Sequence, residues 1–371
     1  MTSPLDHPVR TPPAGREPRP KENGAHEKVH PLRCRRDCGY LLAAVTGCGN
    51  SGNSGNSPEA DSSATKALEK VTYLTSFGNF GRDAYAWVAK EKGFFAEAGF
   101  EVDIKPGGGT GDNLSKIEAR RGDVHTARPH RSAAGPRQRR RQGHHGGGRI
   151  QQNTMAAIIS LEGNQIATPK DLEGKTLADS PSSVVRNLFP TYAKLAGVDA
   201  SKVKWVNGQP TNLIGLLAGG TVAGIGQFVV GKPTVESVAK DKKAVVLPYS
   251  DVMDDLYGNV LVTSAKIAKE NPDTVKRFTA ALIKGLVYSV DNPKEAGELL
   301  QKNVPAAAAA PAAAECELMA AFVRPDGSSA PVGSIDTERV ARSIETLQGA
   351  GAIPAGLTPD QLIDSSLTPA S

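Results

Sequence analysis

Short strand-like and helix-like segments alternate along the body of this 371-residue chain, and the alternation limits its fold more than any other feature. Residues 71–76 read Val-Thr-Tyr-Leu-Thr-Ser, rich in the β-branched and aromatic residues of strands. A helical pattern follows over 84–92. A second strand is expected over 100–104, and a second helix from 110 to about 121. This order is typical of a parallel sheet covered by helices.

The same alternation resumes after residue 150. Strands are expected over 154–160, 176–179, 203–206, 224–230 and 244–247. Helices are expected over 181–195, 212–218, around 235 and over 272–290. Between the first two of these strands, residues 168–175 read Thr-Pro-Lys-Asp-Leu-Glu-Gly-Lys, which indicates a capped turn. The chain therefore predicts two α/β lobes.

Three stretches resemble the periplasmic solute-binding family (SsuA/THI5-like) that serves thiamine-pyrimidine, alkanesulfonate and nitrate importers. They are Ala86–Gly99 (AWVAKEKGFFAEAG), Thr168–Lys175 and Leu216–Gly220 (LLAGG). The resemblance covers roughly residues 70–122 and 150–300. It implies a periplasmic-binding-protein type II-like α/β fold, in which two lobes with central, mostly parallel sheets are joined by two crossing strands and close over a ligand.

The resemblance also implies where the lobes divide. The first lobe is expected over 69–153 and 259–371, and the second over 154–258. The crossing strands are expected at Thr154–Ile158 and Gly258–Val262, so that both chain ends belong to the first lobe. A monomer is expected.

The N-terminal segment, residues 1–47, has the features of a secretory signal: Arg33, Arg35 and Arg36 precede a short apolar run. Val45-Thr46-Gly47-Cys48 resembles the lipobox of bacterial lipoproteins, in which Cys48 would carry the lipid. Residues 48–68 are rich in Gly, Ser and Asn, as in a flexible tether. Residues 1–47 are therefore expected to be a lipoprotein leader and the body an extracytoplasmic, lipid-anchored protein; a short buried helix is the alternative.

Residues 124–149 do not fit the pattern. They hold seven arginines and four of the seven histidines, without an acidic residue or apolar periodicity. The net charge of +5 depends on this stretch and the leader, so the rest of the chain is acidic and not expected to bind nucleic acid. One alternative is a basic arm that binds nucleic acid or anionic lipid. The favoured hypothesis is a compensated frameshift, which would cost the first lobe a core strand.

Three loops at strand ends could hold a ligand, because open α/β folds bind ligands beyond the carboxyl ends of their strands. The loop after the first strand offers Phe77, Asn79, Phe80 and Arg82, which suit a flat heteroaromatic ring. A glycine-rich turn with its phenylalanines in the core is the alternative. The aromatic residues favour a thiamine-precursor pyrimidine or a flavin-like ring over nitrate, whose binding would need concentrated positive charge. A sulfonate is a further candidate solute.

The other two loops are small and polar. Their candidate residues are Gly108, Gly109 and Thr110, and Ser180, Ser182 and Ser183. Backbone N–H groups at helix starts could hold an anion or a polar edge; a tight turn and simple N-capping are the alternatives. Gln227, Tyr257 and Asn259 are expected to complete the cleft from strand ends.

Cysteine and histidine usage bears on catalysis. The four cysteines stand at 34, 38, 48 and 316, and every histidine after residue 50 lies within 124–149. A disulfide framework and a metal site are not expected. We therefore expect a binding protein without catalysis or cofactor. The resemblance implies that its partners are a small solute and an ABC permease. A pyrimidine-synthesising enzyme on the same fold is the rival hypothesis.

Overall fold

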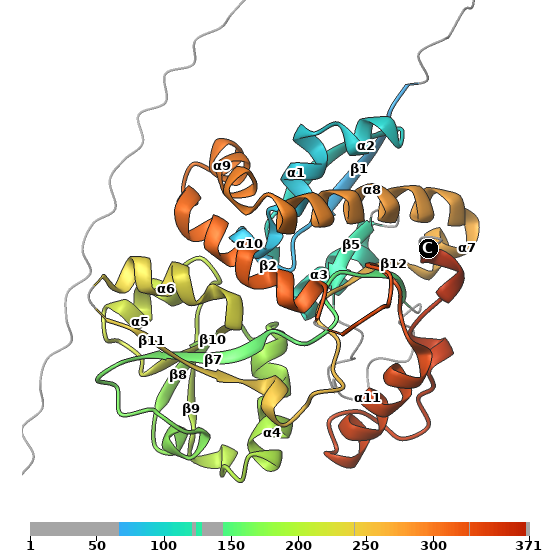
Figure 1. Ribbon diagram of the computed structural model, residues 1–371. Helices are drawn as coiled ribbons and strands as arrows, with labels where there is room; N and C mark the ends of the chain where they lie inside the picture. Colours follow the sequence, from blue (N-terminus) through green and yellow to red (C-terminus); the bar gives the residue numbers. More distant parts are fainter. Residues whose placement is uncertain (1–66, 121–123, 128–143, 241, 326, 369–371) are drawn as a thin grey trace, which may run out of the picture. The chain divides into compact units, whose positions relative to one another are not determined.

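The computed structural model describes residues 67–120, 124–127, 144–240, 242–325 and 327–368 (Figure 1). The lipobox with Cys48, the tether and the middle of the arginine-rich segment lie outside the described residues. Within the described part, none of the helices is both long and apolar enough to cross a bilayer.

The strands form two five-stranded sheets and one short pair. The first sheet has the order β3-β1-β5-β12-β6 and the second the order β11-β7-β10-β8-β9. The strands are β1 Glu69–Leu74, β2 Phe77–Gly78, β3 Phe100–Lys105, β4 Gly107–Gly108, β5 Val124–Ala127, β6 His144–Arg149, β7 Ala156–Leu161, β8 Thr176–Asp179, β9 Lys204–Asn207, β10 Gly224–Phe228, β11 Ala244–Pro248 and β12 Val260–Ser264.

One strand of each sheet runs against the other four. β12 is antiparallel to β5 and β6, and β7 is antiparallel to β10 and β11. In contrast, β1 pairs in parallel with β3, and β8 pairs in parallel with β9. The reversed strands are the ones that the chain enters after passing from one sheet to the other. The fold is therefore α/β with mostly parallel sheets, as the sequence predicts.

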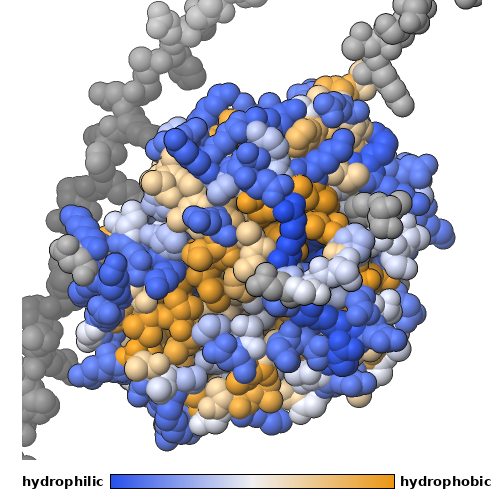
Figure 2. All heavy atoms as spheres, in the orientation of Figure 1, coloured by the Kyte–Doolittle hydropathy of each residue, from blue (hydrophilic) through white to orange (hydrophobic). Residues whose placement is uncertain are grey.

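Helices cover these sheets (Figure 1). They are α1 Tyr85–Glu91, α2 Phe94–Glu97, α3 Thr110–Arg120, α4 Val184–Leu195, α5 Leu213–Ala218, α6 Lys232–Ala239, α7 Ala265–Glu270, α8 Pro272–Asp291, α9 Pro293–Asn303, α10 Ala309–Val323 and α11 Thr337–Gly349. Figure 2 shows apolar residues in the middle of the face that carries α10, where Leu318 is 44% exposed.

Aromatic packing fixes each half of the body. Phe278 on α8 stacks on Phe95 with ring centroids 5.0 Å apart, and it meets the edge of Phe100 at 5.5 Å. Beside the second sheet, Tyr192 and Tyr249 stack at 4.2 Å. Burial of such rings supplies much of the stability of a core.

Two chain segments connect the sheets and lie side by side. The Ile150 N–H donates to the carbonyl of Asn259 at 2.8 Å, and the Thr154 N–H donates to the carbonyl of Leu256 at 2.8 Å. β7 begins at Ala156 and β12 begins at Val260, so each predicted crossing strand overlaps the first residues of a sheet strand. Both connections therefore begin a few residues before the crossing strands that the sequence predicts.

The arginine-rich segment contributes strands at both of its ends, so the expected loss of a core strand does not occur. β5 pairs with β1 and β12, and β6 pairs with β12 at the sheet edge. Glycines in β6 allow α8 to approach closely: a Cβ on Gly148 would lie 2.4 Å from Thr279 Cγ2. Arg149 is buried and donates from Nη2 to the carbonyl of Pro331 at 3.0 Å. Burial lowers the pKa of Arg149 to about 10.

Candidate functional site

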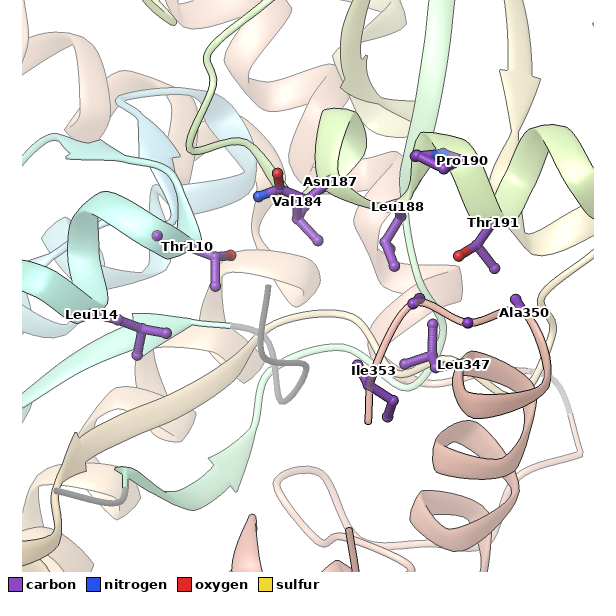
Figure 3. A pocket seen from close by; sticks show the side chains of 13 residues that line it. Thr110, Leu114, Val184, Asn187, Leu188, Pro190, Thr191, Leu347, Ala350 and Ile353 are labelled. Atoms are coloured by element: carbon purple, nitrogen blue, oxygen red, sulfur yellow. The ribbon is translucent and has the colours of Figure 1, made fainter. Parts of the chain in front are cut away.

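A cavity of about 300 Å³ lies where α3, α4 and the turn after α11 meet (Figure 3). Its lining residues are Thr110, Gly111, Leu114, Val184, Asn187, Leu188, Pro190, Thr191, Leu347, Ala350, Gly351, Ala352 and Ile353. Small-molecule sites in proteins start at about this size. Residues from α3, from α4 and from the C-terminal part of the chain therefore line one cavity.

The cavity is polar at the helix starts and mostly apolar elsewhere, with Thr191 on α4 as a further polar residue. Thr110 and Gly111 open α3, and Asn187 lies in the first turn of α4. None of the residues that line the cavity carries a formal charge. The helix dipole makes both helix starts favourable to negative charge, although the N–H groups of Gly111 and Val185 already have partners within the chain. The arrangement therefore fits a small ligand with an anionic or strongly polar end and an apolar body.

The two small polar loops of the sequence analysis contact each other beside this cavity. The Gly111 N–H donates to the carbonyl of Ser182 at 3.2 Å, and Ser180 Oγ donates to the carbonyl of Gly108 at 3.3 Å. Gly109 has φ +107°, and a Cβ there would lie 2.7 Å from the Ser182 oxygen. Of the predicted site residues only Thr110 lines the cavity, and Ser183 caps α4 by accepting a hydrogen bond from the Val185 N–H.

The loop after β1 is filled by its own side chains. The Arg82 guanidinium lies 4.3 Å from the ring centre of Phe80 and 4.4 Å from that of Phe228. Phe77 meets the edge of Phe228 at 6.1 Å, and it is buried. Asn79 is half-buried. Of the two rings that the sequence assigns to a flat ligand, Phe80 thus has its face on an arginine of the same chain and Phe77 is packed against Phe228.

Arg82 also lies between two buried carboxylates. Its Nε is 3.8 Å from Asp83 Oδ2, and its Nη1 is 3.7 Å from Glu315 Oε2. Burial raises the pKa of Asp83 to about 6, although Arg82 and hydrogen bonds from Ser76 oppose the shift. Burial likewise raises the pKa of Glu315 and lowers that of Arg82. This cluster is a structural junction rather than an open binding site.

Another buried carboxylate lies at the carboxyl end of β8. Asp179 Oδ1 accepts a hydrogen bond from the Ser180 N–H at 2.7 Å, and among the described residues no hydrogen-bond donor reaches Oδ2. Burial raises the pKa of Asp179 to about 7, against the hydrogen bond from Ser183 and the charge of Arg186. The strand end next to the serine loop therefore carries a group that titrates near neutral pH.

Three further predicted residues, Gln227, Tyr257 and Asn259, do not line the cavity. Gln227 is buried, and its Oε1 accepts a hydrogen bond from the Phe228 N–H at 3.1 Å. Tyr257 Oη accepts a hydrogen bond from the Asp336 N–H at 3.0 Å. The Asn259 N–H donates to Gln151 Oε1 at 2.7 Å. The last two residues hold the connections between the sheets.

Sequence reasoning missed most of the cavity. Asn187, Leu188 and Thr191 follow the serine loop on α4, and their helical spacing could have placed them on one face. No comparable signal marked the turn 350–353 after α11, because its place against α3 and α4 depends on long-range packing.

A family model described as NMT1/THI5 like matches residues 84–296 of the sequence. The chain belongs to the NMT1/THI5-like family. This match spans α1 to the start of α9, and it includes the two helix starts at the cavity. No curated protein sequence matches the chain.

Solved structures of low identity share the fold of this NMT1/THI5-like protein. The alkanesulfonate-binding protein SsuA from Xanthomonas axonopodis pv. citri, bound to MOPS, superposes with a TM-score of 0.61 at 14% identity, over 81% of this chain and 99% of that one. The periplasmic nitrate-binding protein NrtA from Synechocystis PCC 6803 gives 0.61 at 13% identity, over 82% and 87%. The periplasmic aliphatic sulphonate binding protein SsuA from Escherichia coli gives 0.59 at 14%, over 80% and 97%.

Proposed function

We propose that this protein is the extracytoplasmic solute-binding component of an ABC importer and that it carries a small organic anion in the cavity between α3, α4 and the turn after α11. The cavity is the observation that carries the proposal: it lies at the starts of two helices, and uncharged, mostly apolar side chains line it. The folds of the sulfonate- and nitrate-binding proteins support a transport role.

The lining favours a sulfonate or a similar organic anion among the candidate solutes. An oxyanion suits helix N-termini, and a short carbon chain suits Leu114, Leu188 and Leu347. Nitrate has no apolar part to bury, so it would leave most of this cavity unused. A thiamine-precursor pyrimidine fits the size of the cavity, but it has no negative charge to place at the two helix starts.

The sole described cysteine supports binding without catalysis. Cys316 is fully buried and donates from Sγ to the carbonyl of Gly81 at 3.1 Å. Burial raises the pKa of its thiol, which leaves it protonated and unreactive at neutral pH. The pyrimidine-synthesising enzymes of the resemblance depend on a cysteine-rich motif and a histidine, so this proposal does not include their activity.

The proposal places the protein on the outer face of the cell membrane. Cys48 would carry the lipid anchor, residues 48–68 would act as the tether, and the body would meet the permease as a monomer. Metabolic labelling with a fatty acid tests the anchor. Incorporation that is lost in Cys48→Ala is expected, and incorporation that persists in this variant would place the anchor elsewhere.

A thermal-shift experiment on the full chain tests the solute. Butanesulfonate, an aminopyrimidine, riboflavin and nitrate serve as probes, and butanesulfonate should raise Tm most. A ligand at a hundred times its Kd adds about 2.7 kcal/mol of stability. Asn187→Leu, which removes the polar group at the start of α4, should weaken the response, whereas Gln301→Ala on exposed α9 is the matched control. No response to any probe argues against the proposal.

A further inference from the structure

One wall of the cavity comes from a part of the chain outside the family match. The match ends at residue 296, whereas Leu347 lies in the last turn of α11 and the turn 350–353 follows that helix. Leu347 and Ile353 are buried, and Ala350 and Ala352 are half-buried. This C-terminal wall, defined as Leu347 and residues 350–353, is apolar except for its backbone.

The helix that carries the wall is fixed to both connections between the sheets. Arg339 donates from Nη2 to Asn153 Oδ1 at 2.6 Å on the first connection. It donates from Nε to the carbonyl of Asp255 at 3.1 Å on the second, and Ser343 Oγ donates to the same carbonyl at 2.8 Å. Because these groups hold α11 from several sides, its far end has a defined position.

The turn after α11 is fixed as well. Gly351 has φ +77°, a conformation that glycine adopts without strain, and the Ala352 N–H donates to the carbonyl of Leu347 at 2.8 Å. Lys194 in the last turn of α4 donates from Nζ to the carbonyl of Gly349 at 3.2 Å. The C-terminal wall is therefore bound to the connections and to one of the helices that open at the cavity.

The polar side chains of the lining are Thr110, Asn187 and Thr191, and the first two lie near the helix starts. Figure 3 shows Thr110 and Asn187 on the side away from Leu347 and Ile353. An anion at the two helix starts would direct its carbon chain toward the C-terminal wall. The distance between the helix starts and the C-terminal wall then limits the length of the carbon chain. A longer chain would have to displace well-packed side chains, which costs strain energy.

We propose that the C-terminal wall selects the length of the apolar part of the solute, with Ile353 and Ala352 as the specificity-determining residues. This inference rests on the proposed function, since it takes the solute to be an organic anion in this cavity. It adds that the discrimination between homologous solutes comes from the C-terminal part of the chain and not from the family core.

A series of linear sulfonates from methanesulfonate to octanesulfonate tests the inference by isothermal titration calorimetry on the full chain. Ile353→Ala, which lengthens the cavity, should move the tightest binding to a longer chain. Ala352→Leu, which shortens it, should weaken the longest bound homologue about tenfold while sparing methanesulfonate. Ile283→Ala on α8 and Ala355→Leu on the exposed surface are the matched controls.

The outcomes separate the two proposals. Binding with the same order of chain lengths in the wild type and in both wall variants overturns the inference and leaves the proposed function intact. Absence of binding for every sulfonate, in the wild type too, overturns both. Ile353→Val retains most of the packing and repeats the first test if Ile353→Ala does not fold; a small shift toward longer chains is then expected.

Discussion

Arg82 Nη1 lies 3.7 Å from Glu315 Oε2, and both side chains are fully buried. The pair joins parts of the chain that are far apart in sequence, because Glu315 belongs to α10 and also accepts hydrogen bonds from the Arg82 N–H and from Thr234 Oγ1 on α6. With Phe80 and Phe228 on the faces of the guanidinium, this junction occupies the position where the sequence predicts a ligand ring.

The first prediction concerns this pair. Glu315→Ala should destabilise the protein by about 3–5 kcal/mol, because it leaves the buried charge of Arg82 with one carboxylate fewer. Glu315→Gln keeps the shape and should cost less. Urea denaturation measures both. Glu97→Ala, which removes an exposed pair 3.9 Å from Lys284, is the control and should cost at most about 1 kcal/mol. Equal effects at both glutamates would contradict a buried ion pair.

The second prediction concerns pH. The pKa of Asp179 is raised from 3.8 to about 7, so the folded state binds the proton more tightly than the unfolded state. The stability that this proton adds is present below about pH 4 and is lost as pH rises to about 7. Asp179→Asn retains the acceptor for the Ser180 N–H and should remove this loss.

Urea titrations between pH 4 and pH 8 measure the effect. Asp179→Asn should reduce the dependence of the free energy of unfolding on pH. Above pH 7 the free energy of unfolding of the variant should exceed that of the wild type by roughly 2–4 kcal/mol. Asp273→Asn, at an exposed position on α8, is the control and should leave the profile unchanged. A wild-type stability that increases from pH 4 to pH 7, with the same slope in Asp179→Asn, would contradict the prediction.

Many strands and helices between residues 71 and 290 were predictable because their signals are local, whereas none of the helices α9, α10 and α11 was expected from the sequence. The expected strand over 176–179 is observed as β8, and the expected helix ending at Leu195 is observed as α4 with Ser183 as its N-cap. The capped turn at 168–175 is also confirmed, since Asp171 Oδ2 accepts hydrogen bonds from the Thr168 N–H and hydroxyl. Apolar runs bounded by capping residues are enough for such elements.

β5 and β6 were not predictable for the opposite reason. Residues 144–149 read His-His-Gly-Gly-Gly-Arg, without the alternation of a strand. Their place depends on the ladder with β12, which is over a hundred residues away in sequence. The C-terminal wall of the cavity depends in the same way on contacts of α11 with distant connections. Patterns in sequence do not carry such long-range pairings.

The third prediction tests whether β6 packs as the structure has it. Gly148→Ala would bring a methyl group within 2.4 Å of Thr279 Cγ2. Thr279 cannot turn away easily, because its Oγ1 donates to the carbonyl of Val275 at 2.7 Å. A loss of about 1–3 kcal/mol is expected. Gly215→Ala on α5 meets nothing within 4 Å and is the control, neutral or slightly stabilising. Equal stabilities in urea would show that β6 is not against α8.

The fourth prediction concerns Arg339, which binds both connections between the sheets. Arg339→Leu should cost about 2–3 kcal/mol, because it removes charged hydrogen bonds to Asn153 Oδ1 and to the carbonyls of Asp254 and Asp255. Amide hydrogen exchange should then rise at residues 150–155 and 253–259, where the backbone bonds between the connections would open more often.

Arg342 provides the control for this residue because it lies one turn further along the same helix. Its Nε contacts Asp255 Oδ1 at 3.1 Å, but its side chain is 50% exposed. Arg342→Leu should therefore cost at most about 1 kcal/mol and leave the exchange of the connections unchanged. Arg339→Lys keeps the charge but lacks the guanidinium fork that reaches both connections, so it should resemble Arg339→Leu more than the wild type. Full recovery in Arg339→Lys would mean that charge alone, and not the geometry of the fork, holds α11 in place.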